Sequence, residues 1–198
     1  KSAITQLPTS SYAIAAAYAL GRAVDDEIIS AVTGTAYTGE TGSTSTSFTS
    51  GNAITESSTG GLTLAKLRNA KQILDSNSVD PSIARFIIVA PVAISDLLGV
   101  TQATSSDYAS VKALVNGEID TFMGFKFVMS NRLSKTGNLR KCLVYAQDGM
   151  LLALGADIVT RIDERSDKGY ATQVYCSQSV GSTRMEESKC VSIESYEA

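Results

Sequence analysis

Acidic and nucleophilic side chains are the residues of this sequence that could do chemistry. Adjacent carboxylates occur at Asp25-Asp26 and Glu186-Glu187, and serine and lysine are plentiful. Neighbouring positions on a helix or a strand point in different directions, so neither pair brings two carboxylates to one substrate for acid–base catalysis. A catalytic serine–lysine dyad is not excluded, because the number of serines and lysines does not show whether two of them lie close together. The favoured interpretation is that the protein is not an enzyme.

Histidine and cysteine usage narrows the kinds of site further. The sequence has no histidine, which removes imidazole catalysis, the usual serine and cysteine triads and most metal sites. The cysteines, Cys142, Cys176 and Cys190, lie far apart without a CxxC spacing, so neither a zinc site nor a redox dithiol is indicated. We predict small hydrophobic residues in strands of a protein kept in a reducing compartment. No metal and no cofactor are expected.

Length and net charge bound the class of protein. A chain of 198 residues can form one large domain or two small lobes around a sizeable core. Its net charge of −3 argues against binding nucleic acid through a basic face. A protein of this charge can still enclose DNA without binding it tightly. No apolar run approaches the length of a membrane span, so no membrane partner is expected.

Charged residues concentrate in the last quarter of the chain, at 155–194. Residues 157–163 alternate in polarity like a half-buried strand, and the charged tract 164–169 ends in glycine like a turn. Residues 170–180 are rich in Thr, Val and Tyr, so we predict a long antiparallel pair with a charged elbow. Such a mixed-sign strip suits contacts between copies of a protein. The candidate contacts here are Arg161, Asp163, Arg165, Asp167, Lys168 and Arg184.

Three charged residues elsewhere join these candidates for inter-subunit contacts. Arg22 and Asp25 lie three residues apart on a predicted helix, where opposite charges pair. Arg132 follows a predicted strand and could instead bond to a loop of its own chain. For every candidate, a solvated surface charge is an equally good explanation, because isolated surface ion pairs contribute only about 0–1 kcal/mol.

The elements that must position these charges follow from hydrophobic periodicity. Residues 12–32 show an apolar stripe, which predicts a long amphipathic helix ending at Gly34. The stripe consists of Ala17, Gly21, Val24, Ile28 and Val32. The stretch 35–61, dominated by Thr, Ser and Gly, predicts a long loop or irregular hairpin. Further helices are predicted at 62–75, at 92–98 and after 105–107, and strands at 85–90, 125–129, 140–145 and 150–154.

Five stretches, taken in this order, resemble the major capsid proteins of tailed bacteriophages, in the version carried by short-tailed phages. They are 21–29 (GRAVDDEII), 85–91 (RFIIVAP), 107–120, 124–133 (GFKFVMSNRL) and 155–194. The resemblance covers nearly the whole chain. It implies an α+β fold, the tailed-phage and herpesvirus capsid fold, in which a peripheral lobe with a long spine helix and long antiparallel strands carries an inserted α/β axial lobe.

The resemblance also implies how the chain divides. Residues 1–36 are the first part of the peripheral lobe with the spine helix, and 37–60 are the Gly/Ser/Thr-rich loop. The axial lobe is expected at 61–154 and the long peripheral strands at 155–180. Residues 181–198 are expected to return toward the axial lobe as a C-terminal strand. Relatives carry an N-terminal arm and an extended loop before the spine helix, which we expect to be cleaved from or omitted from this chain.

The function implied by the resemblance is structural. The protein would assemble with itself, as hexamers and pentamers, into the icosahedral phage head that encloses double-stranded DNA without sequence-specific binding. Scaffolding, portal and decoration proteins are the further implied partners. The implied location is the virion, with assembly in the host bacterial cytoplasm. The alternative is the shell protein of a bacterial encapsulin compartment, which the resemblance implies has the same fold and holds an enzyme cargo.

Overall fold

The computed structural model describes residues 11–55, 60–100 and 121–197. The helix predicted after 105–107 lies outside these residues. The described chain divides into two compact units: one comprises residues up to Ile28 together with Leu152–Ser182, and the other comprises Ile29–Leu151 together with the residues from Thr183 onward. These boundaries cut across the predicted 1–36 segment, because the last turn of its helix packs into the core of the second unit.

The long helix predicted at 12–32 is confirmed as α1, Ser11–Thr33. It ends where predicted, since the backbone N–H of Gly34 donates to the carbonyl of Ser30 at 2.9 Å, and a side chain at Gly34 would collide with that oxygen. The predicted apolar stripe is confirmed in the second half of the helix, where Val24 and Ile28 are half-buried and Val32 is buried. It is wrong in the first half, where Ala17 and Gly21 are exposed and the half-buried positions are Ala16 and Leu20.

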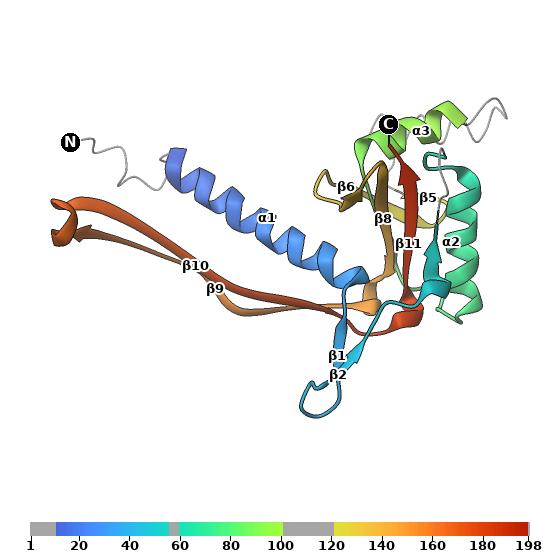
Figure 1. The fold of residues 1–198 in the computed structure, drawn as a ribbon, viewed down its shortest axis with the longest axis horizontal. Coiled ribbons are helices and arrows are strands. Elements are labelled where there is room, and N and C mark those ends of the chain that lie inside the picture. Colours follow the sequence, from blue (N-terminus) through green and yellow to red (C-terminus); the bar gives the residue numbers. More distant parts are fainter. Residues whose placement is uncertain (1–10, 56–59, 101–120, 198) are drawn as a thin grey trace. The chain divides into compact units, whose positions relative to one another are not determined.

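The charged stretch forms a long hairpin of two strands (Figure 1), β9 (Met150–Arg165) and β10 (Ala171–Arg184). A single 3-10 turn, Ser166–Lys168, joins them, and Gly169 takes the left-handed conformation with φ 64°. The predicted pair with a charged elbow is therefore confirmed. Two details were wrong: the strands predicted at 150–154 and 157–163 are one strand, and the residues expected to be half-buried are exposed.

The second unit contains a seven-stranded sheet in the order β3-β11-β8-β4-β6-β5, with β7 also paired to β8. Strands β4 and β6 are parallel, and β8 runs antiparallel to both β4 and β11. The strands predicted at 85–90, 125–129 and 140–145 are confirmed. The bounds are β3 Ala53–Ile54, β4 Arg85–Val89, β5 Thr121–Phe122, β6 Phe125–Met129, β7 Lys135–Thr136, β8 Leu139–Ala146 and β11 Cys190–Tyr196.

The predicted loop at 35–61 is more ordered than its composition indicates. It begins with a short hairpin of β1 (Ala36–Thr38) and β2 (Thr44–Thr46). Strand β3 then joins the central sheet by pairing in parallel with β11 at Ser192 and Ile193. Part of the stretch is thus sheet, because backbone hydrogen bonds hold residues that have little apolar surface of their own.

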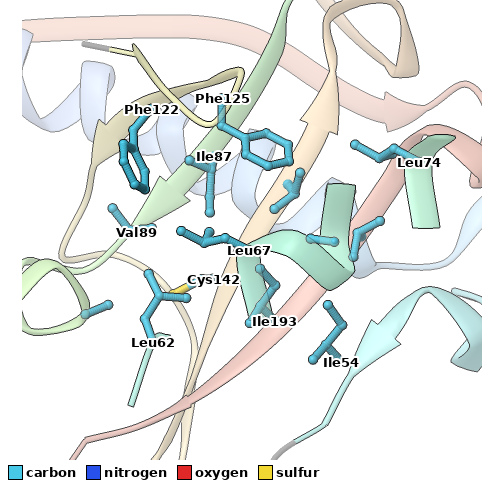
Figure 2. Packing of buried hydrophobic residues seen from close by; sticks show 14 of the residues in the cluster. Ile54, Leu62, Leu67, Leu74, Ile87, Val89, Phe122, Phe125, Cys142 and Ile193 are labelled. Carbon is cyan, nitrogen blue, oxygen red and sulfur yellow. The ribbon is translucent and has the colours of Figure 1, made fainter. Parts of the chain in front are cut away.

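Two helices pack against the sheet unit: α2 (Leu64–Ser76) and α3 (Pro91–Val100), which correspond to the helices predicted at 62–75 and 92–98. The side chain of Thr63 caps α2 by accepting from the N–H of Lys66 at 3.3 Å. Its buried face meets sheet residues in one cluster (Figure 2). That cluster includes Leu67, Leu74, Ile87, Phe125, Cys142 and Ile193.

A second cluster buries the end of α1. Ile29 and Val32 pack there with Leu143 of β8 and Cys190 of β11. Cys142 and Cys190 are fully buried in strands, as predicted, while Cys176 is half-buried in β10. All three thiols are free. Burial raises the pKa of Cys142 to about 11 and that of Cys190 to about 12, so both stay protonated near neutral pH.

Candidate assembly surfaces

The β9–β10 hairpin has two chemically different faces. Thr160 and Cys176 lie on one face, because Oγ1 and Sγ are 3.7 Å apart across the strands. Gly155 and Ser179 share the other face, where a Cβ on Gly155 would lie 3.0 Å from Oγ of Ser179. Alternation along each strand then assigns the remaining residues. The apolar face carries Leu152, Leu154, Ile158, Ile162, Val174 and Val180, and the polar face carries Asp157, Val159, Arg161, Asp163, Arg165 and Tyr175.

The apolar face is open to solvent. Leu154 is 59% exposed, Ile158 47% and Ile162 46%. On the polar face Val159 is 43% exposed, so neither face of β9 is covered. Contiguous exposed apolar side chains of this kind mark interaction sites on soluble proteins.

The charged elbow holds an ion pair of its own. Nε and Nη2 of Arg165 donate to the two carboxylate oxygens of Asp167 at 2.9 and 2.5 Å. The guanidinium holds the pKa of Asp167 below its usual range. Both side chains are about half exposed, so another molecule can still reach them. Arg161, Asp163 and Lys168 are exposed beside this pair.

The other predicted contacts lie on separate elements. Arg22 and Asp25 are exposed on α1, in the same unit as the hairpin. Arg132 is exposed in the sheet unit, in the turn after β6, where its backbone N–H donates to Oγ of Ser130 at 3.2 Å. Their role between subunits stays a prediction, as it does for the elbow residues.

Arg184, predicted to be a surface contact, is buried within its own chain instead. Only 5% of the residue is exposed. Its Nη1 donates to the carbonyls of Val32 at 3.0 Å and Gly34 at 2.8 Å, and lies 3.4 Å from that of Ala31. A helix leaves its last carbonyls without intrahelical partners, so Arg184 satisfies the end of α1 from a distant part of the sequence.

The same guanidinium binds three further groups. Nε donates to the Glu187 carboxylate at 2.9 Å, and Nη2 lies 3.4 Å from the carbonyl of Thr46 in β2. The guanidinium also lies over the ring of Phe48, 5.3 Å from its centroid. Glu187 in turn accepts from the backbone N–H of Thr49. We call Arg184 and Glu187 the Arg184 clamp, because together they join α1, β2 and the segment before β11.

Sequence analysis also missed two other cations that bind within the chain. Nζ of Lys66 donates to three carbonyls, those of Gly60, Gly61 and Glu194, at 2.8 to 2.9 Å. Arg140 pairs with Glu197 at 2.5 Å and keeps the pKa of that carboxyl below its usual range. Lys66 adjoins the apolar stripe of α2, which is the one sequence signal that it faces inward.

Asp96 is a half-buried carboxylate whose Oδ2 atom is buried without a hydrogen-bond partner in the described part of the chain. Burial raises its pKa above the usual range, while a hydrogen bond with the backbone of Leu62 acts in the opposite direction. The carboxylate packs against Gly61, and a Cβ there would overlap it. Asp96 therefore fixes the chain before α2 against α3 and leaves no room for a side chain at Gly61.

A hollow beside α2 is lined by residues that include Lys71, Asp75 and Ser76. Asp75 is paired there with Arg85 at 2.7 Å. No group of three or more Cys, Asp or Glu that could hold a metal occurs in the described residues. Within the same residues, no helix is long and apolar enough to cross a membrane.

Comparisons with known proteins show a family and a fold. The sequence profile of a family described as phage capsid protein matches residues 1–197. No curated protein matches the chain. A structure from Mycobacterium phage Che8 is similar, with a TM-score of 0.70 and 16% identity over 93% of this chain and 62% of that one.

Two further structures share this architecture. The capsid of cyanophage P-SCSP1u has a TM-score of 0.65 and 17% identity, over 96% of this chain and 66% of that one. The holo-SrpI encapsulin complex from Synechococcus elongatus has a TM-score of 0.60 and 11% identity, over 96% and 67%. At these identities the likeness is one of fold. The chain spans less than two thirds of the length of the two phage chains.

Proposed function

The chain belongs to the phage capsid protein family and has the α+β tailed-phage capsid fold, and on that premise we propose that it is the major capsid protein of a phage head. In this role copies of the chain assemble as hexamers and pentamers into an icosahedral shell around double-stranded DNA. The head is then the place where the protein works, and it is built in the cytoplasm of a bacterial host.

One observation of the structure carries the proposal. The hairpin is long, exposes aliphatic side chains, and has no buried residue among its described positions from Leu152 to Ser182. An enzyme or a small-molecule binder has no need of such an element, whereas a shell protein uses extended surfaces to contact its copies. With a net charge of −3, the chain would enclose DNA rather than grip it. Scaffolding, portal and decoration proteins are the further partners of this proposal.

The elbow provides a direct test of contact between copies. Arg165→Glu or Asp167→Arg alone breaks the pair within the chain and also changes the surface. The double reversal, Arg165→Asp with Asp167→Arg, restores a pair within the chain but inverts its polarity toward a neighbour. We expect electron microscopy of the intact protein to show defective shells for the double reversal. Normal shells at ordinary salt would exclude the elbow from inter-subunit contacts.

An encapsulin shell is the second candidate function, supported by the similarity in fold to the Synechococcus complex. The two functions differ in what the particle holds. Electron microscopy of the native particle separates them, because a phage head holds a genome and a portal vertex, whereas an encapsulin is a small closed shell with enzyme cargo. Failure of the intact protein to form particles at any concentration would overturn both.

A further inference from the structure

The unit that contains the hairpin has no core of its own. None of its described residues is buried, while the sheet unit holds every buried hydrophobic side chain of the described chain. A two-stranded hairpin is at best marginally stable in water. A helix likewise gains most of its stability from packing an apolar face. This unit therefore lacks the burial that would hold it folded in a single copy.

The two faces of the hairpin differ in the free energy that would be gained by covering them. The apolar face carries four large aliphatic residues on β9 alone, Leu152, Leu154, Ile158 and Ile162. Along the same length the polar face carries Val159 as its one large aliphatic residue, together with the small residues Ala153 and Gly155 and the charged residues Asp157 and Arg161. Removing the apolar face from water gives the larger hydrophobic gain and leaves fewer charges to desolvate.

The charges at the elbow indicate what could cover this face. Residues 161–168 carry three cations and three anions, so the charges of this stretch balance. A surface with equal numbers of both signs can meet another copy of itself without net repulsion, and it offers no excess charge to a strongly basic or acidic partner. A second copy of this chain is the occupant that this pattern fits.

We propose that a second copy covers the apolar face of the hairpin and thereby completes the folding of this unit, so that ordering and assembly are one step. The inference rests on the proposed function and adds a sequence of events to it. The sheet unit folds in the free chain, because it has its own core. The hairpin unit gains its stability when copies meet, as segments that fold on binding do.

Hydrogen exchange tests the order of events. In the unassembled intact protein, amides of β9 and β10 should exchange at least about 100-fold faster than those of β8, since local opening free energies follow buried contacts. In particles the same amides should become protected. Equal protection of β8, β9 and β10 before assembly would overturn the inference, because the unit would then be stable alone.

Two adjacent residues provide a matched test of the face. Ile158 and Val159 are both β-branched, neighbours on one strand and similarly exposed, at 47% and 43%, but they lie on opposite faces. Ile158→Ser should raise the concentration needed for assembly by about tenfold, the effect of losing one apolar contact. Val159→Ser should leave that concentration nearly unchanged.

The outcomes separate this inference from the function on which it rests. If the wild-type protein forms particles and the two variants assemble alike, or if Val159→Ser is the worse, the apolar face is not the covered one and the inference fails alone. If the wild-type protein never forms particles, the proposed function fails with it. Circular dichroism of both variants confirms that the sheet unit is folded before assembly is compared.

Discussion

Replacing Arg184 by methionine tests the clamp at the end of α1. Methionine keeps an unbranched apolar stem but has no guanidinium, so the contact of that group with the ring of Phe48 is lost together with its hydrogen bonds. The change removes every donor that Arg184 offers to the carbonyls of Val32 and Gly34 and to the carboxylate of Glu187. The stability that is lost then reports the polar contacts of the clamp.

The magnitude follows from the burial of the two partners. Breaking a buried ion pair by removing one member costs about 3–5 kcal/mol, because a charge is left without compensation. The Glu187 side chain is 25% exposed, so solvent relieves part of that cost, while the buried helix carbonyls add to it. We expect a loss of about 3 kcal/mol, near the lower end of the range.

Thermal and urea unfolding of the unassembled protein measure this loss. In a chain of this size each kcal/mol shifts Tm by about 2–4 °C, so the expected decrease is about 6–12 °C. Arg165→Met is the matched control, because Arg165 also pairs with one carboxylate but is half exposed. It should move Tm little. Equal shifts for the two variants would refute the reasoning that burial makes the clamp strong.

Three other predictions concern single side chains. Burial raises the pKa of Asp96, so protonated Asp96 stabilises the fold below the unfolded pKa of about 3.8, and this stability is lost as pH rises through the folded pKa. Asp96→Asn should remove this loss when the free energy of unfolding is measured against pH, and an unchanged pH profile would contradict the prediction. Gly61→Ala should cost about 1–3 kcal/mol by overlap with that carboxylate, read from the urea midpoint; an unchanged midpoint would contradict the close packing of Gly61 against Asp96. Maleimide labelling followed by mass spectrometry should modify Cys176 well before Cys142, which is buried and protonated; comparable rates would show that the sheet core opens readily.

Periodicity located the elements that bury a face within one chain. The helices α1 and α2 and the strands β4, β6 and β8 follow the predicted ranges, because each has its apolar residues against the sheet core or at its edge. The continuity of β9 was missed because Gly155 resembles a break in sequence. In the structure it is an ordinary strand position that lies close to Ser179.

Other features depend on contacts that no local pattern contains. The burial of Arg184 depends on Gly34, which lies 150 residues earlier. The polarity of residues 157–163 predicted a half-buried strand, but the single chain leaves it exposed. If a second copy covers the apolar face, the alternating polarity of residues 157–163 corresponds to burial in the assembly rather than in the single chain. The assignment of individual charges to inter-subunit contacts stays a prediction, because a sequence of one chain does not contain its neighbours.

The position of β11 has a consequence for synthesis on the ribosome. This strand pairs with both β3 and β8, yet it follows every one of its partners in the chain. The sheet therefore lacks an inner strand until residues 190–196 have left the ribosome, and the Arg184 clamp is absent for nearly as long. Long-range pairing of this kind delays folding until the last of the paired strands has emerged. A nascent chain would then remain incompletely folded, and unable to join a growing shell prematurely, until β11 is available to pair.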